Sequence, residues 1–105
     1  MLQKHNRYRL RVPVIFSWQD GQEGQRKAVG LTRDISLTGA FVLTTSPPPL
    51  GANIRLKGFL PAVPGAVQTL QIYGNGLVVR VERPHDSQTQ GGFEVAGRPF
   101  VLRRG

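Results

Sequence analysis

Two short polar segments of this chain carry the residue types that could do chemistry. The first is the run Arg7-Tyr8-Arg9-Leu10-Arg11, which has an arginine at every second position. Alternate side chains of an extended segment point to the same side, so the three guanidinium groups are predicted to form one outward-facing row. A guanidinium group can bind a phosphate through two hydrogen bonds, contact O6 and N7 of guanine, or stack on a purine ring. A basic edge strand that resists aggregation would show the same pattern.

The second segment is Asp34-Ile35-Ser36-Leu37-Thr38-Gly39. An ionised Asp34 only accepts hydrogen bonds, so it complements the N–H donors on the Watson–Crick edge of guanine, or it holds an arginine in place. The hydroxyl of Ser36 can both donate and accept, and Gly39 would allow a positive φ or a close backbone approach. A tight turn that closes a hairpin would use the same residues.

Groups suited to catalysis or metal binding are sparse in the sequence. The chain has no cysteine, its two histidines (His5 and His85) lie near opposite ends, and its six carboxylates are scattered. It contains no phosphate-loop, His-Glu-x-x-His or Gly-x-Ser-x-Gly motif. We therefore predict a protein that is not an enzyme, with no catalytic residues, no metal site and no cofactor.

The charge of the chain predicts an anionic partner. Lys and Arg number 14 against 6 Asp and Glu, a formal net charge of +8, and only Lys4, Lys27 and Lys57 of the basic residues are not arginine. Arginine favours forked contacts to phosphate and guanine.

The chain has neither an apolar leader nor a run of about 20 apolar residues, which predicts no membrane span and a cytoplasmic location, alone or as the cytoplasmic domain of a larger bacterial protein.

The 105 residues are expected to form one domain, residues 1–105, whose basic residues 1–11 form a flexible arm leading into the first strand. Helical periodicity is absent, and 13 Gly and 8 Pro punctuate the chain. Alternating apolar residues instead predict a first strand with Leu10, Val12, Val14 and Phe16 facing inward. Further strands are expected at about 27–33, 40–44, 54–60, 68–82, 92–95 and 100–102.

Two details of these strands matter for the interior. In the second strand, Val29 and Leu31 are expected to face inward. In the long fifth strand, Leu77, Val79 and Val81 are expected to share one face, and Gly74-Asn75-Gly76 is interpreted as a bulge inside one strand rather than a hairpin turn. About six short strands with Gly and Pro turns predict an all-β fold, either a closed barrel or a sandwich.

The two polar segments together resemble the signature motifs of the PilZ domain family. Arg7-x-x-x-Arg11 enters the first strand, and Asp34-x-Ser36-x-x-Gly39 follows about one hairpin later. The segments 77–81 (Leu-Val-Val-Arg-Val) and 91–95 (Gly-Gly-Phe-Glu-Val) also resemble the family's late strands, so the similarity covers nearly the whole chain. Many family members have a further arginine before the first motif, where this chain has Asn6. That position is associated with the number of stacked ligand molecules.

The resemblance implies a six-stranded antiparallel β-barrel that binds the bacterial second messenger cyclic di-GMP. It implies that Arg7 and Arg11 contact guanine and phosphate, and that Asp34, Ser36 and Gly39 hold the guanine edge. Arg9 and Arg33 are further candidate phosphate or stacking contacts. Binding would order the arginine arm and relay the signal to a protein partner or a fused effector domain.

Two alternatives use the same charge. A single-stranded nucleic-acid-binding barrel normally presents several exposed aromatic residues. The phenylalanines of this chain mostly lie in apolar runs typical of a core, so nucleic acid is the less favoured partner. The other alternative is a PilZ-like protein-interaction module that does not bind nucleotide.

Overall fold

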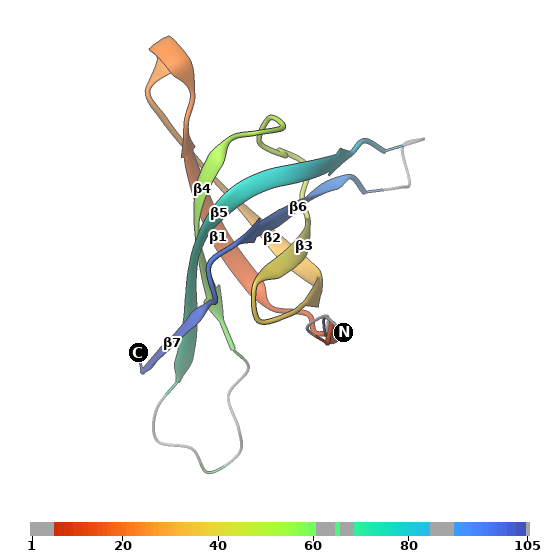
Figure 1. The fold of residues 1–105 in the computed structure, drawn as a ribbon, viewed down its shortest axis with the longest axis vertical. Coiled ribbons are helices and arrows are strands. Elements are labelled where there is room, and N and C mark those ends of the chain that lie inside the picture. Colours follow the sequence, from red (N-terminus) through yellow and green to blue (C-terminus); the bar gives the residue numbers. More distant parts are fainter. Residues whose placement is uncertain (1–5, 61–64, 66–68, 85–89, 105) are drawn as a thin grey trace, which may run out of the picture.

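The computed structural model describes residues 6–60, 65, 69–84 and 90–104 of the chain. These residues form seven strands and one short 3-10 turn, η1 (Gly21–Glu23), and none of them belongs to a helix long and apolar enough to cross a bilayer. Figure 1 shows the strands wrapped around one interior, with the long β5 crossing the molecule. The strands are β1 (Pro13–Gln19), β2 (Gln25–Ile35), β3 (Gly39–Leu43), β4 (Asn53–Phe59), β5 (Leu70–Glu82), β6 (Gly92–Gly97) and β7 (Val101–Arg104).

Six of the strands close into a barrel. Their order is β4-β1-β2-β3-β6-β5, and a further pairing between β4 and β5 completes the ring. Every pairing is antiparallel, and β7 adds a seventh strand alongside the first half of β5. The predicted six-stranded antiparallel β-barrel is confirmed, with β7 as an addition to it.

The first strand is inward-facing as predicted, except at its start. Val12, Val14 and Phe16 are at most 2% exposed and belong to the core, whereas Leu10 is 39% exposed. The prediction for Leu10 is wrong because the regular strand begins only at Pro13. Of the residues just before it, Val12 enters the core and Leu10 does not, although the backbone carbonyl of Leu10 accepts a hydrogen bond from the hydroxyl of the buried Thr32 on β2.

The inward face of β2 is the opposite of the one predicted. Val29 is 69% exposed and Leu31 is only partly buried, while Thr32 is fully buried. A side chain at Gly30 would place its Cβ 2.6 Å from the carbonyl oxygen of Leu43 and 2.6 Å from a methyl group of Val42. Because bulky neighbours already fill this part of the interior, β2 contributes small residues there and turns its larger aliphatic residues outward.

The long fifth strand is one continuous strand, as predicted, but its bulge lies elsewhere. Its pairing with β4 runs without a shift through Gly74–Gly76, where glycine is needed because a Cβ at Gly74 would lie 2.2 Å from the ring of Phe100. The register instead shifts between Val78 and Arg80 in the pairing with β6. Leu77 (46% exposed) and Val79 (50%) face outward, whereas Val81 packs against the core. The prediction that these three residues share one face is therefore wrong.

Candidate functional site

The turn between β2 and β3 is built from the residues of the second polar segment. The backbone N–H of Ser36 donates to the carbonyl oxygen of Gly39 at 2.8 Å, and the Ser36 hydroxyl approaches the same oxygen at 3.3 Å. Gly39 does not have a positive φ, but a Cβ there would lie 2.9 Å from the carbonyl oxygen of Val95. Of the two predicted reasons for glycine, the close backbone approach is therefore the correct one, and the backbone approached is that of β6.

An irregularity in β2 brings two consecutive residues to the same face. The pairing with β3 shifts between Thr32 and Asp34, so Arg33 is the extra residue of a β-bulge. Residues of a regular strand alternate between faces, and a bulge suspends that alternation. Arg33 and Asp34 therefore both lie on the outer surface of the barrel, where their side chains form an ion pair of 2.9 Å.

Asp34 is the best-buried carboxylate of this surface, with a side chain 14% exposed. Its Oδ1 accepts a 2.8 Å hydrogen bond from Nε of Arg7 and a second bond from Nη2 of the same guanidinium, while Oδ2 accepts from Arg33. Burial by itself would raise the pKa of Asp34, but the hydrogen bonds and positive charges of Arg7 and Arg33 outweigh it and hold the pKa below its ordinary value. Asp34 is therefore ionised at neutral pH.

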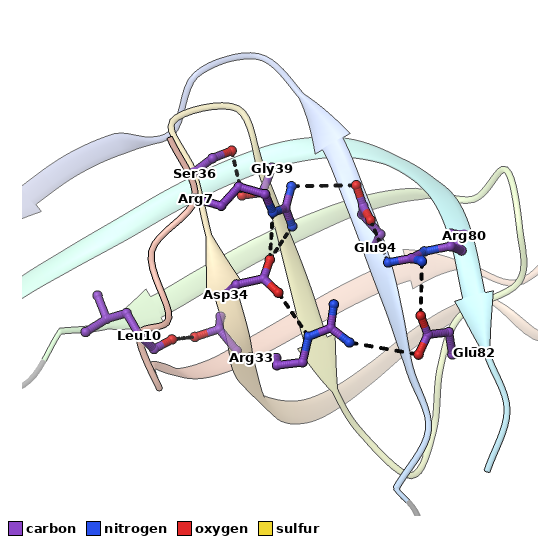
Figure 2. A network of polar contacts seen from close by, with 10 residues as sticks. Arg7, Leu10, Arg33, Asp34, Ser36, Gly39, Arg80, Glu82 and Glu94 are labelled. Carbon is purple, nitrogen blue, oxygen red and sulfur yellow. Dashed lines mark hydrogen bonds and ion pairs between the residues drawn. The ribbon is translucent and has the colours of Figure 1, made fainter. Parts of the chain in front are cut away.

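The contacts of Asp34 continue into a closed ring of alternating charge (Figure 2). On the far side, Arg80 lies 3.1 Å from both Glu82 and Glu94. The ring closes through Glu82, 4.0 Å from Arg33, and through Glu94, 3.7 Å from Arg7. We call this the arginine–carboxylate ring, and its members in order are Arg7, Asp34, Arg33, Glu82, Arg80 and Glu94. Its three positive and three negative charges sum to zero.

A phenylalanine on the outer face of β3 forms the floor of the ring. Phe41 is 1% exposed, yet it does not belong to the core cluster that its strand neighbours Ala40 and Val42 join. The Arg33 guanidinium lies 4.0 Å from the centroid of the Phe41 ring, and that of Arg80 lies at 5.3 Å. Cation–π attraction and the covered apolar area fix both arginines in place.

The sequence model of the PilZ domain family matches residues 2–97 of the chain. This chain belongs to the PilZ domain family. The match covers all six strands of the barrel and both polar segments, and PilZ domains are known as a family that binds cyclic di-GMP. Comparison with curated proteins and with solved structures found no match.

In this PilZ domain the arginine segment lies against the end of β2. Tyr8 and Ile35 exchange backbone hydrogen bonds of 2.8 and 2.9 Å, and the backbone N–H of Val12 donates to the Thr32 hydroxyl at 2.8 Å. Arg9 and Arg11 are exposed and form no ion pair within the part of the chain that the structure describes. Residues 1–5 lie outside the described residues, and the flexibility of the arm stays a prediction.

The structure thus gathers some of the predicted site residues and separates others. Arg7, Arg33 and Asp34 meet in the ring. Ser36 and Gly39 form the adjoining turn, and their polar contacts stay within that turn. The exposed Arg9 and Arg11 extend along the arm.

Sequence reasoning missed four residues of the site: Phe41, Arg80, Glu82 and Glu94. Arg80 and Glu94 are directly opposite each other in the β5–β6 pairing. A charged pair in the middle of two late strands was a signal, but the strand register needed to place it beside Asp34 cannot be derived from one sequence.

Proposed function

We propose that this PilZ domain is a receptor module for cyclic di-GMP and binds it over the arginine–carboxylate ring and the neighbouring arm. The observation that carries the proposal is the ionised Asp34, held on the barrel surface by Arg7 and Arg33 in a chain of this family. The ligand has two guanines and two phosphates. Its guanines need an acceptor for their N–H groups, and its phosphates need forked cations.

Asp34 has capacity left for a guanine. A carboxylate offers about four acceptor positions. Hydrogen bonds from Arg7 and Arg33 fill three of these positions, two on Oδ1 and one on Oδ2. One guanine N–H can therefore approach Oδ2 with the ring intact. A guanine that uses both oxygens must displace Arg7, which then becomes available to a phosphate or to guanine O6 and N7.

The attraction for a dianion comes from the arm rather than from the ring. The ring is neutral overall, because each of its arginines is matched by a carboxylate. Arg9 and Arg11 are exposed on the neighbouring segment, so they supply the excess positive charge. In the proposed complex they bind the phosphates while Asp34, with the turn at Ser36 and Gly39, receives the guanine edge.

The proposed relay is an ordering of the arm. Two backbone hydrogen bonds between Tyr8 and Ile35 already anchor its middle, so ligand-driven ordering concerns the arginine side chains and the segment before Tyr8. Neutralising the clustered positive charges would let this segment settle on the ring. The surface so formed would be recognised by a protein partner or an attached effector domain.

Isothermal titration calorimetry of cyclic di-GMP into the chain tests the proposal. We expect saturable binding, with no heat from GTP at the same concentration. Arg11→Ala should weaken binding by about tenfold or more, since a hydrogen bond to a charged group contributes about 1.5–3 kcal/mol. Arg55→Ala, which removes an exposed cation from the β4 surface far from the ring, is the matched control and should bind normally. No heat from cyclic di-GMP would refute the proposal.

A further inference from the structure

A second basic surface lies on the wall of the barrel away from the ring. The ring is built on β2, β3, β6 and the second half of β5, whereas a groove of about 740 Å³ runs over β1, β4, the first half of β5 and β7. Its lining includes four basic side chains, and none of its lining residues is Asp or Glu. The basic residues of this groove, which we call the basic groove, are Lys27, Arg55, Lys57 and Arg103.

The strand register aligns these cations across the sheet. Lys27 on β2 and Arg55 on β4 both lie opposite Ser17 of β1, and Arg103 on β7 lies opposite Gln71 of β5. From β2 to β7 the groove crosses four interstrand steps of about 4.8 Å, so it extends over roughly 19 Å. One phosphate cannot span that distance, and an extended polyanion can.

The charge of the basic groove is uncompensated. In the described part of the chain, none of its four cations forms an ion pair, and all eight ion pairs there involve Arg7, Arg26, Arg33 or Arg80. The protein thus pairs the arginines of the arginine–carboxylate ring with carboxylates and leaves the four cations of the basic groove without them. Such a distribution favours an anionic partner at the basic groove.

An aromatic ring lies among these cations. Tyr73 is directly opposite Lys57, whose ammonium lies 5.6 Å from the Tyr73 ring centroid, and the Arg103 guanidinium lies 5.2 Å from it. The Tyr73 hydroxyl bonds to Gln71 at 2.6 Å, which fixes the ring. Asn75 adds an amide to the groove lining. Both cations lie over the Tyr73 ring, so a base stacks on it when Lys57 or Arg103 turns from the ring to an adjoining phosphate.

We propose that the basic groove binds single-stranded nucleic acid. The combination of a cationic track with an aromatic side chain and an amide fits a chain of phosphates and bases, because each of these groups has a counterpart in that ligand. An acidic peptide has no bases to stack on the ring of Tyr73. An anionic bilayer would meet the cations at a flat plane, whereas here they line a hollow.

Fluorescence anisotropy with a labelled oligothymidylate of roughly 12 nucleotides tests this proposal. Single-strand binding falls with salt with a logarithmic slope of about −0.7 per neutralised phosphate, so four cations predict a slope near −2.8 and roughly fiftyfold weaker binding between about 50 and about 200 mM salt. Arg55→Ala with Lys57→Ala should reduce the slope to about −1.4. Tyr73→Leu should weaken binding at least about fivefold and leave the slope unchanged.

The control is a variant with the same change in charge on the other wall, Arg9→Ala with Arg11→Ala, which should keep the native slope. Lys27→Gln with Arg103→Gln repeats the test if the first pair of substitutions prevents folding, as judged by circular dichroism. Equal slopes for the native chain and both groove variants would overturn the proposal. So would an unaltered affinity of Tyr73→Leu together with equal binding of a polyglutamate peptide or of phosphatidylserine vesicles.

The proposal is independent of cyclic di-GMP binding. The oligonucleotide assay contains no cyclic dinucleotide, and its variants lie outside the arginine–carboxylate ring. A chain that binds the oligonucleotide and shows no heat with cyclic di-GMP would support the basic groove and refute the receptor role. The reverse result would refute the basic groove alone.

Discussion

Asp34→Asn isolates the charge at the centre of the arginine–carboxylate ring. The substitution keeps the size of the side chain, but an amide can no longer accept from both Arg7 and Arg33, and its NH₂ group must face a guanidinium. Exposed ion pairs contribute about 0.2–1 kcal/mol and hydrogen bonds to charged groups up to about 3 kcal/mol. Asp34 is 14% exposed, while its two partners are 38% and 43% exposed. We therefore expect the free energy of unfolding to fall by about 1–3 kcal/mol.

Thermal and urea denaturation at neutral pH measure this loss. For a domain of about 100 residues, 1 kcal/mol corresponds to about 4–8 °C in Tm, so a loss of about 1–3 kcal/mol predicts a decrease of roughly 4–24 °C. Asp20→Asn is the matched control, because Asp20 also pairs with an arginine at 2.9 Å but is 39% exposed. It should cost about 0.5 kcal/mol or less.

The pH dependence gives an independent check on the same carboxylate. The pKa of Asp34 is lower in the folded chain than its ordinary value of 3.8. The stabilisation is therefore fully present above that ordinary value and is lost as the pH falls through the lowered folded pKa. The difference in stability between the native chain and Asp34→Asn should stay constant from about pH 7 to pH 5 and shrink below about pH 4. Equal stabilities at pH 7, or a difference that grows in acid, would refute the role assigned to Asp34.

Three further substitutions test other parts of the site. Phe41→Ala should lower the free energy of unfolding by about 3–5 kcal/mol, because the ring is 1% exposed beneath two arginines; a loss under about 1 kcal/mol in urea denaturation would contradict this floor. Gly39→Ala should cost about 1–3 kcal/mol by the same measurement, because its Cβ would lie 2.9 Å from the carbonyl oxygen of Val95, and an unchanged stability would show that this approach is unimportant. Glu94→Gln removes a carboxylate that lies 3.1 and 3.7 Å from two ring arginines, and it should bind cyclic di-GMP about three- to fivefold more tightly in calorimetry, for an ion pair of about 1 kcal/mol or less. A weaker affinity would indicate instead that Glu94 contacts the ligand.

The fold class could be predicted from the sequence because it rests on local patterns. Alternation and the Gly and Pro turns predicted strands, and the family motifs predicted how many of them form the barrel. The inward faces of β2 and of part of β5 could not be predicted in this way. Val29 and Leu31 resemble core residues, yet the space opposite Gly30 is already filled by residues of other strands. The space available opposite a residue inside a barrel depends on side chains from several strands, so the local pattern of one strand does not determine it.

The candidate site was predictable mainly where its residues belong to the two signature motifs. Asp34 and Arg7 belong to the two signature segments, and the structure joins them. Arg33 lies on the same face of β2 as Val29 and Leu31, and a β-bulge after Thr32 keeps Asp34 on that outer surface as well. A second bulge before Arg80 does the same for Arg80 on β5. A bulge depends on pairing with another strand, so a single sequence does not reveal which residues it turns outward.

The most direct test of cyclic di-GMP binding at the arginine–carboxylate ring is a titration of the isotopically labelled chain with this ligand, followed by the backbone amide signals in NMR spectra. We expect saturable shifts that cluster on the arginine segment, on Asp34 and the turn to Gly39, and on β6 at Glu94, with the signals of Lys57 and Tyr73 unchanged. No shifts at high ligand concentration, or shifts centred on Lys57 and Tyr73, would contradict it.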